Sequence, residues 1–183
     1  MIIPPEQTEI DEMWMHEALK EAQKAADLGE VPIGAVAVYQ GEIIGRGHNR
    51  KESDQDPIAH AEILALQQAA QHLGSWRLID VTLYCTLEPC PMCGGAMMQA
   101  RLPRLVYGAP DLKFGADGSI VSIMEPQADQ EKQFNHFVSI RRGVLANESI
   151  SMLQHFFRTI RQNAKRRKAE QSSDTPPTTS TPL

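Results

Sequence analysis

The chain has 183 residues, 42% of them hydrophobic and 22% charged, which fits one globular domain and leaves no room for a second catalytic domain. Its formal net charge of −5 argues against a surface that is basic throughout. No apolar stretch approaches the ~20 residues of a membrane span, and the N-terminus lacks the basic and apolar regions of a signal peptide. We therefore expect a cytoplasmic protein with no membrane partner.

The order of the periodic segments predicts a sheet with helices on both faces. Apolar residues recur mostly at intervals of three and four in the first segment, and a tight hairpin turn follows at Gln40-Gly41. The predicted elements are, in chain order, a helix over residues 10–28, strands over 33–39 and 42–46, a helix over 59–71, a strand over 78–84, a helix over 90–99, strands over 104–107 and 137–141, and a helix over 147–167. We expect a domain over 1–170, followed by a disordered Pro/Ser/Thr-rich tail over 171–183.

Two short motifs open two of these helices and offer ligands for one metal ion. His60 and Glu62 lie in the first turn of one predicted helix, while Cys90 and Cys93 are three residues apart and share one face of another. A structural zinc site is closed by four protein ligands, whereas a catalytic zinc site keeps one position for water. One His and two Cys therefore predict a catalytic zinc ion held by His60, Cys90 and Cys93. The Cys pair alone would also suit a redox motif or half of a structural zinc site, but the whole set disfavours both.

Glu62 has a role in the chemistry that such a site performs. Zinc held by two thiolates and a neutral His lowers the pKa of its water towards ~7, so that hydroxide is available at neutral pH. Glu62 is then the predicted general acid and base, which takes a proton from the water and passes protons to the substrate and to its departing group. Cys85, the third cysteine, lies in an apolar run and is expected to be a buried small hydrophobic residue.

These motifs together resemble the signature of the zinc-dependent nucleobase deaminases. The resemblance covers residues 10–168 and looks closest to the bacterial tRNA-specific adenosine deaminases. It is carried by the segments 30–36, 47–50, 56–63, 86–97, 107–111 and 156–158. It implies a three-layer α/β/α cytidine deaminase-like fold with a central mixed sheet of about five strands, a homodimer, and one zinc ion per subunit. It also implies hydrolytic deamination of the wobble adenosine to inosine in the anticodon loop of an arginine tRNA.

Four substrate-binding residues follow from the resemblance by position. Asn49 and Ala61 stand where the reacting base would be bound, and Asp111 and Lys113 stand where flanking nucleotides would be met. The alternatives are an ordinary turn residue at Asn49 and a solvated loop at 111–113. Leu112 and Phe114 depart from the smaller or more polar residues expected beside Lys113.

The basic residues gather near the end of the chain. Residues 141–168 hold eight basic residues against Glu148 alone, a formal charge of +7, which leaves −12 on the rest of the chain. The basic end of the last predicted helix suits RNA phosphates, although a solvated helix end has the same composition. Met97, Met98 and Gln99 are candidates for a dimer interface, and core packing explains the two methionines equally well.

Two other functions remain open from the sequence. A deaminase of a free base or nucleotide, such as cytosine, guanine or deoxycytidylate, would share every zinc residue. A catalytically silent nucleic-acid-binding module could keep zinc for stability alone. The presence of Glu62 disfavours the silent module, because binding and stability do not require a proton acceptor there.

Overall fold

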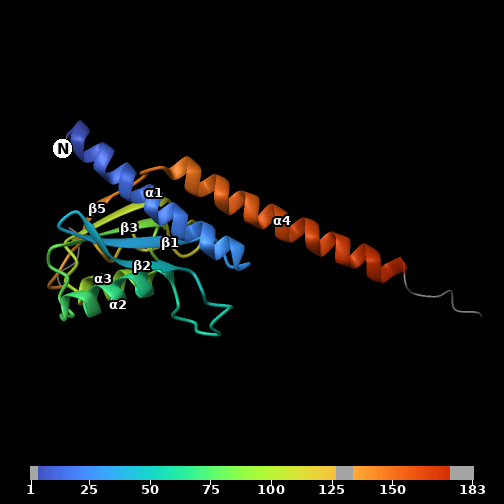
Figure 1. Cartoon of the computed structure of the whole chain (residues 1–183), viewed down its shortest axis with the longest axis horizontal. Helices are drawn as coiled ribbons and strands as arrows, with labels where there is room; N and C mark the ends of the chain where they lie inside the picture. Colours follow the sequence, from blue (N-terminus) through green and yellow to red (C-terminus); the bar gives the residue numbers. More distant parts are fainter. Residues whose placement is uncertain (1–3, 127–133, 174–183) are drawn as a thin grey trace, which may run out of the picture.

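The computed structural model describes residues 4–126 and 134–173, with side chains up to residue 168, and has three layers, with helices on both faces of a five-stranded mixed sheet (Figure 1). The elements are α1 (Pro5–Asp27), β1 (Gly34–Tyr39), β2 (Glu42–His48), α2 (Ala61–Leu73), β3 (Val81–Leu87), α3 (Pro91–Gln99), β4 (Arg104–Ala109), β5 (Ser139–Arg141) and α4 (Ala146–Ser173). The strand order is β2-β1-β3-β4-β5, antiparallel from β2 to β3 and parallel from β3 to β5. The predicted fold class is confirmed.

The hairpin of β1 and β2 closes with the turn chemistry that its sequence predicts. Gln40 and Gly41 both have positive φ, 50° and 79°. Two central residues with positive φ match the right-handed twist of the flanking strands, and Gly adopts this conformation without a steric penalty. The turn thus fixes which residues of β1 face each side of the sheet.

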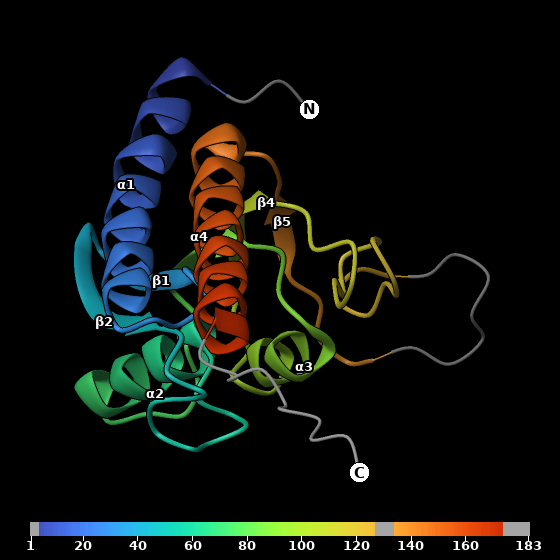
Figure 2. The ribbon, with the colours of Figure 1, turned by 90° about the vertical axis from the view of Figure 1, so that its right-hand side faces the viewer.

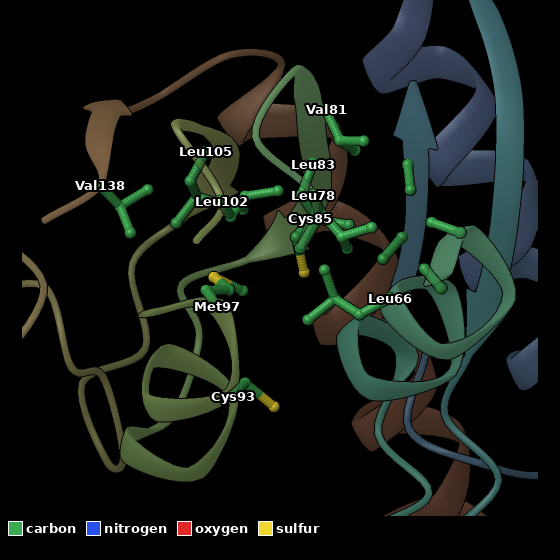
Figure 3. Close-up of a cluster of buried hydrophobic side chains, with 14 of the residues drawn as sticks. Leu66, Leu78, Val81, Leu83, Cys85, Cys93, Met97, Leu102, Leu105 and Val138 are labelled. Atoms are coloured by element: carbon green, nitrogen blue, oxygen red, sulfur yellow. The ribbon is translucent and has the colours of Figure 1, made fainter. Parts of the chain in front are cut away.

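Side chains along the strands alternate between two hydrophobic clusters. On one side, α2 and α3 cover a cluster that includes Ala35, Ala37, Leu83 and Cys85 (Figure 3). On the other, α1 and α4 lie over the sheet, and the intervening residues Val36, Val38, Tyr84 and Val106 pack with Met15 of α1 and with Val144 before α4 (Figure 2). This period of two is the reason that a single sheet can support a helical layer on each face. Cys85 is fully buried, as expected for a packing residue.

The backbone of α2 lies directly against β2 at two glycines. A Cβ built at Gly45 would lie 2.2 Å from the carbonyl oxygen of Ala65, and one at Gly47 would lie 2.1 Å from that of Ala61. Any side chain at either position would therefore push α2 away from the sheet. The glycines fix the distance of the helix N-terminus from the sheet, and that N-terminus carries two of the candidate site residues.

Buried charge holds the opposite layer in place. Asp11 of α1 is fully buried and accepts hydrogen bonds from Arg104 at 2.6 Å and from the Tyr84 hydroxyl at 2.9 Å, and it also pairs with Arg141. Arg141 belongs to the basic segment 141–168, so part of that positive charge is used inside the protein. The two ion pairs connect α1 to β4 and β5, and the hydrogen bond of Tyr84 connects it to β3.

Several element boundaries differ from the sequence prediction. α1 begins at Pro5 rather than 10, and α2 begins at Ala61 rather than 59, which places His60 just before the helix. The first turns of α1 are polar, and apolar periodicity does not detect a polar turn. The prediction for β3 was wrong at both ends, since the strand runs over Val81–Leu87. Its last residues belong to the segment that leads to Cys90.

The last helix continues further than predicted. α4 extends to Ser173, through the Lys, Ala, Glu and Gln residues at 168–171, which are good helix formers. The remainder of the predicted tail lies outside the described residues. No helix within residues 4–126 and 134–173 is long and apolar enough to cross a membrane.

Candidate metal and active site

Two helix N-termini bring the candidate metal ligands together. His60 is the N-cap of α2 and Cys90 is the N-cap of α3, both with extended backbones, and Cys93 lies in the first turn of α3. Pro91 at the first position of α3 favours a helix start there, because its fixed φ suits the helix and its missing N–H would be unpaired in any case. The partial positive charge at each N-terminus stabilises thiolates and other anions in the space between them.

The distances among the three ligand atoms fit a tetrahedral zinc ion. The sulfur atoms of Cys90 and Cys93 are 3.7 Å apart, and His60 Nδ1 lies 3.7 Å from the Cys90 sulfur and 3.6 Å from the Cys93 sulfur. Zinc bonds of about 2.3 Å to sulfur and 2.0 Å to nitrogen, at tetrahedral angles, separate two sulfurs by about 3.8 Å and sulfur from nitrogen by about 3.5 Å. Within the described part of the chain, this is the one group of such side chains close enough to hold a metal ion.

The protonation of the two cysteines favours a metal site as well. The hydrogen bond between the Cys90 and Cys93 sulfur groups lowers the pKa of Cys90 to about 4, and the ring of His60 acts in the same direction. The same hydrogen bond, together with burial, raises the pKa of Cys93. The pKa of one cysteine of the pair is thus lowered, and because zinc binds the thiolate form, a bound metal ion would displace the remaining thiol proton.

Glu62 lies beside this group without belonging to it. It is the second residue of α2 and is only 4% exposed. Burial raises the pKa of Glu62, while its own backbone N–H and the nearby His60 lower it. A buried carboxyl group with a raised pKa next to a metal site has the properties of a group that exchanges protons with a reactant.

A cleft of about 710 Å³ opens over these residues and contains all the substrate-binding residues predicted from the sequence. It is lined by Asn49 and Ala61, by Asp111 and Lys113, and by His60, Glu62 and Cys90. Cys93 is buried beneath it. Its other lining residues are mostly apolar, and they include Ile33, Leu87, Met92, Leu153 and Phe157. A mostly apolar cleft with a few polar groups at its base is typical of a small-molecule or nucleobase pocket.

Two buried carboxylates that support the cleft were not found from the sequence. Glu30 is 2% exposed and accepts hydrogen bonds from Asn49 Nδ2 at 3.1 Å and from the Ser53 N–H at 2.6 Å. Glu88 is also 2% exposed, and its oxygens accept hydrogen bonds from the loop after β4. Burial raises the pKa of Glu88, but the hydrogen bonds from Ser119 and from backbone N–H groups outweigh burial, so that the net shift is downward.

Leu153 and Phe157 of α4 also line the cleft without having been predicted there. They are four residues apart and so lie on the same side of the helix. This spacing was the signal available in the sequence, although it does not reveal which structure the helix faces. α4 therefore contributes one wall of the cleft in addition to covering the sheet.

The comparisons with known proteins agree with this site. The family described as MafB19-like deaminase matches residues 9–161. The tRNA-specific adenosine deaminase of Bacillus subtilis is 50% identical over 155 residues, which are 85% of this chain and 93% of the relative. That of Streptococcus pyogenes serotype M18 is 46% identical over 152 residues, 83% of this chain and 92% of the relative.

A solved structure from a study of A-to-I editing by tRNA:A34 deaminases superimposes with a TM-score of 0.68 at 40% identity, over 77% of this chain and 99% of the other. The fold and the His/Cys/Cys group therefore define the class, a deaminase with the cytidine deaminase-like fold. Within that class, the chain belongs to the family of the tRNA-specific adenosine deaminases.

Proposed function

We propose that this protein hydrolyses the wobble adenosine of an arginine tRNA to inosine and ammonia. The observation that carries the proposal is the placement of Glu62, His60, Cys90 and Cys93 at the base of a cleft that continues onto a basic helix. The relatives that match nearly their whole length are named tRNA-specific adenosine deaminases. The related solved structure comes from work on editing at the wobble position of transfer RNA.

His60, Cys90 and Cys93 would hold one zinc ion per subunit, since their distances match its bond lengths. Zinc, when bound, acidifies water so that hydroxide is available near neutral pH. Glu62 accepts a proton from the attacking water and gives it to the adenine ring nitrogen. It then moves the second proton of the water to the amine, which leaves as ammonia.

Asn49 and Ala61 would bind and orient the base. The hydrogen bond from Asn49 Nδ2 to Glu30 fixes the amide in one orientation, so its remaining polar positions are available to a purine ring. Ala61 is the first residue of α2, and its N–H has no acceptor within the helix. A base hydrogen-bonded by both groups would present its amine to Glu62.

The RNA on either side of the base would contact the rim of the cleft and α4. Phe157 lines the cleft, and Arg161 comes four residues later, so helical spacing puts Arg161 on the same side of α4; both residues are exposed. Single-stranded RNA is bound by aromatic stacking and by cationic groups on its phosphates, and such a path along α4 exceeds what a free base needs. Lys113 and Asp111 would meet the nucleotides next to the adenosine.

Action on tRNA is also our reason to propose a cytoplasmic location.

A homodimer is the assembly we propose, on the family resemblance. Met97 and Met98 are 0% and 8% exposed and pack in the core of a single chain, while Gln99 is exposed. Of the three interface candidates, Gln99 therefore has the most surface to offer to a partner. Light scattering on the purified protein would give the mass in solution and so test the dimer directly.

The deciding experiment offers the zinc-loaded protein an arginine tRNA with an ACG anticodon, in parallel with adenosine, cytosine, cytidine, guanine and deoxycytidylate. We expect inosine at the wobble position, ammonia in equal amount, and no product from the small molecules. Ammonia from a free base or nucleotide, with the tRNA unchanged, would replace the proposal with a small-molecule deaminase. A metal measurement on the same sample should give one zinc per chain.

A further inference from the structure

The rim loop, residues 110–120, forms one edge of the cleft and is not held there by the packing of its outer side chains. Leu112 is 77% exposed and Phe114 is 67% exposed, and both line the cleft. Exposed side chains contribute little burial energy to the position of a loop. Another set of interactions must therefore fix the loop.

Glu88 supplies those interactions from beneath the loop. Its Oε2 accepts a hydrogen bond from the Asp111 N–H at 2.9 Å, and its Oε1 accepts from the N–H of Asp117 at 2.9 Å and of Ser119 at 3.3 Å. The Ser119 hydroxyl also donates to Oε2. Hydrogen bonds to a buried carboxylate are stronger than those between neutral groups, so this clamp is a strong polar anchor of the loop. Further along, the loop is also held by the ion pair of Asp117 with Arg142 and by the hydrogen bond from the Ala116 N–H to the carbonyl oxygen of Pro89.

The anchored end of the loop determines where the exposed side chains lie. Asp111, held through its N–H by Glu88, accepts hydrogen bonds at Oδ1 from the N–H groups of Lys113 at 2.9 Å and Phe114 at 3.3 Å. A shift of Asp111 would thus move Lys113 and Phe114 with it. The backbone of Glu88 is itself fixed, since its N–H donates to the carbonyl oxygen of Ala109 at 2.8 Å.

Gly115 fits this clamp from the opposite side. A Cβ built at Gly115 would lie 2.3 to 2.5 Å from the carboxyl atoms of Glu88. The φ of Gly115 is not positive, so an alanine there would meet only the steric conflict. The loop and the carboxylate are therefore in direct contact, and either partner can be changed to disturb it.

We propose that Glu88 is a positioning residue of the deaminase, which holds the rim loop so that Lys113 and Phe114 meet the RNA next to the reacting adenosine. This inference rests on the proposed function for its substrate. Glu88 is one of the residues that line the cleft, but the hydrogen bonds described for its carboxylate all come from the loop, and it acts through them. Its loss should weaken RNA binding more than it slows the chemical step.

The substitution Glu88→Gln separates hydrogen bonding from packing, because the two side chains have nearly the same shape. A carboxamide has one oxygen, so one side of the clamp loses its acceptor. The Ser119 hydroxyl can turn to accept from an NH₂ group, which makes the Oε2 side the easier place for the nitrogen. The Asp111 N–H would then be left unpaired while the N–H groups of Asp117 and Ser119 keep their acceptor.

The test compares the wild type, Glu88→Gln and Gly115→Ala with two controls, Glu12→Gln on the exposed side of α1 and Gly95→Ala, where an added Cβ meets nothing within 4 Å. Backbone amide hydrogen exchange is measured by NMR on the protein alone, and kcat and KM are measured on an anticodon stem–loop RNA. For Glu88→Gln we expect the Asp111 amide to exchange about 10-fold faster and KM to rise roughly 5- to 10-fold, with kcat within about 2-fold and zinc content unchanged. Gly115→Ala should change KM in the same direction.

Two outcomes would overturn the inference. Wild-type exchange and KM in Glu88→Gln would show that the clamp does not position the loop. Loss of zinc together with a fall in kcat at constant KM would show that Glu88 supports Cys90 instead. Because the exchange measurement uses no RNA, it tests the clamp even if the wild type fails to edit tRNA, and that failure would count against the proposed function alone.

Discussion

The two faces of the sheet use the same packing device and differ in the polar groups that they bury. On each face a glycine lets a helix backbone lie directly against the sheet. Gly47 contacts α2 and Gly34 contacts α1. A Cβ added at Gly34 would lie 2.1 Å from the carbonyl oxygen of Ala18. Beneath α1 the buried charge is paired, as with Asp11 and its two arginines. At the N-terminus of α2, the Glu62 carboxyl group is buried without an arginine or lysine partner in the interactions described.

This difference in buried charge predicts that one face of the sheet mainly determines stability and the other mainly determines activity. A paired buried charge adds to stability only while both partners are present, and its loss is felt by the whole fold. A buried carboxyl group without a basic partner costs stability, and it persists where chemistry requires it. Substitutions on the α1 face should therefore change unfolding, and substitutions at the base of the cleft should change turnover.

Glu62→Gln should have the largest effect of all. Loss of the proposed proton-transferring group is expected to lower kcat by about 10²- to 10⁴-fold, because general acid–base catalysis contributes an effect of this order. Zinc content and the free energy of unfolding should stay at wild-type values or rise slightly. Single-turnover assays with urea unfolding would check both, and a fully active variant would remove Glu62 from the mechanism.

Asp11→Asn should have the converse effect. It leaves Arg104 and Arg141 facing a neutral group at a buried position, and we expect the free energy of unfolding to fall by about 3 kcal/mol. Below the unfolding transition, kcat and KM should be unchanged. A fall in kcat without a change in stability would contradict the division between the faces.

The pH dependence of that effect follows from the pKa of Asp11. Burial raises this pKa, but the hydrogen bond and charge of Arg104, with Tyr84 and Gln7, outweigh burial and bring it below the ordinary value of an aspartate. A carboxyl group with a lowered folded pKa adds stability above its unfolded pKa and loses it as pH falls through the folded value. The stability difference between wild type and Asp11→Asn should thus be constant near neutral pH and shrink in acid. Urea unfolding at a series of pH values measures this.

Gly47→Ala and Gly34→Ala form a matched pair, one on each face. Each adds a methyl group within contact of a helix carbonyl oxygen, and each should cost about 1–3 kcal/mol of stability through overpacking. Only Gly47→Ala moves the N-terminus that carries His60 and Glu62, so only this variant should also lower zinc affinity and kcat. Equal losses of kcat in both variants would mean that the faces are coupled more closely than their polar groups indicate.

The smallest effect is expected on α4. Arg161→Gln should raise KM for tRNA by roughly 2- to 3-fold and reduce the slope of log KM against log salt concentration by somewhat less than one unit, as for one phosphate contact. Arg77→Gln is the matched control, since Arg77 stacks over Trp76 away from the cleft lining. Identical salt slopes for both variants would exclude Arg161 from the RNA path.

The sequence predicted the residues of the metal site, but it did not predict the buried carboxylates that hold the surrounding loops. His60, Glu62, Cys90 and Cys93 fall in two contiguous motifs, and the helix N-termini that hold them follow from proline and local pattern. Glu30 and Glu88 act on residues 19 to 31 positions away, and no periodicity reports such a pairing. Strands were predicted correctly from alternation and helices from recurrence at three and four, whereas the ends of α1 and α4 lie in polar segments that carry no apolar signal. For β3 the apolar residues continue on both sides of each predicted end, so the apolar pattern did not mark where the strand begins and ends.

α4 extends well beyond the cleft, and its length could therefore distinguish the proposed tRNA substrate from smaller molecules. At 1.5 Å per residue, the 28 residues of α4 reach about 42 Å, and the 11 residues that follow Phe157, up to Lys168, cover about 16.5 Å beyond the cleft. A free base bound in the cleft as proposed would have no atoms along the rest of this distance, whereas an extended polynucleotide could follow it. Shortening the helix from its C-terminal end should therefore leave any activity on small molecules as it is, and should make the enzyme progressively less able to tell a tRNA from a short oligonucleotide.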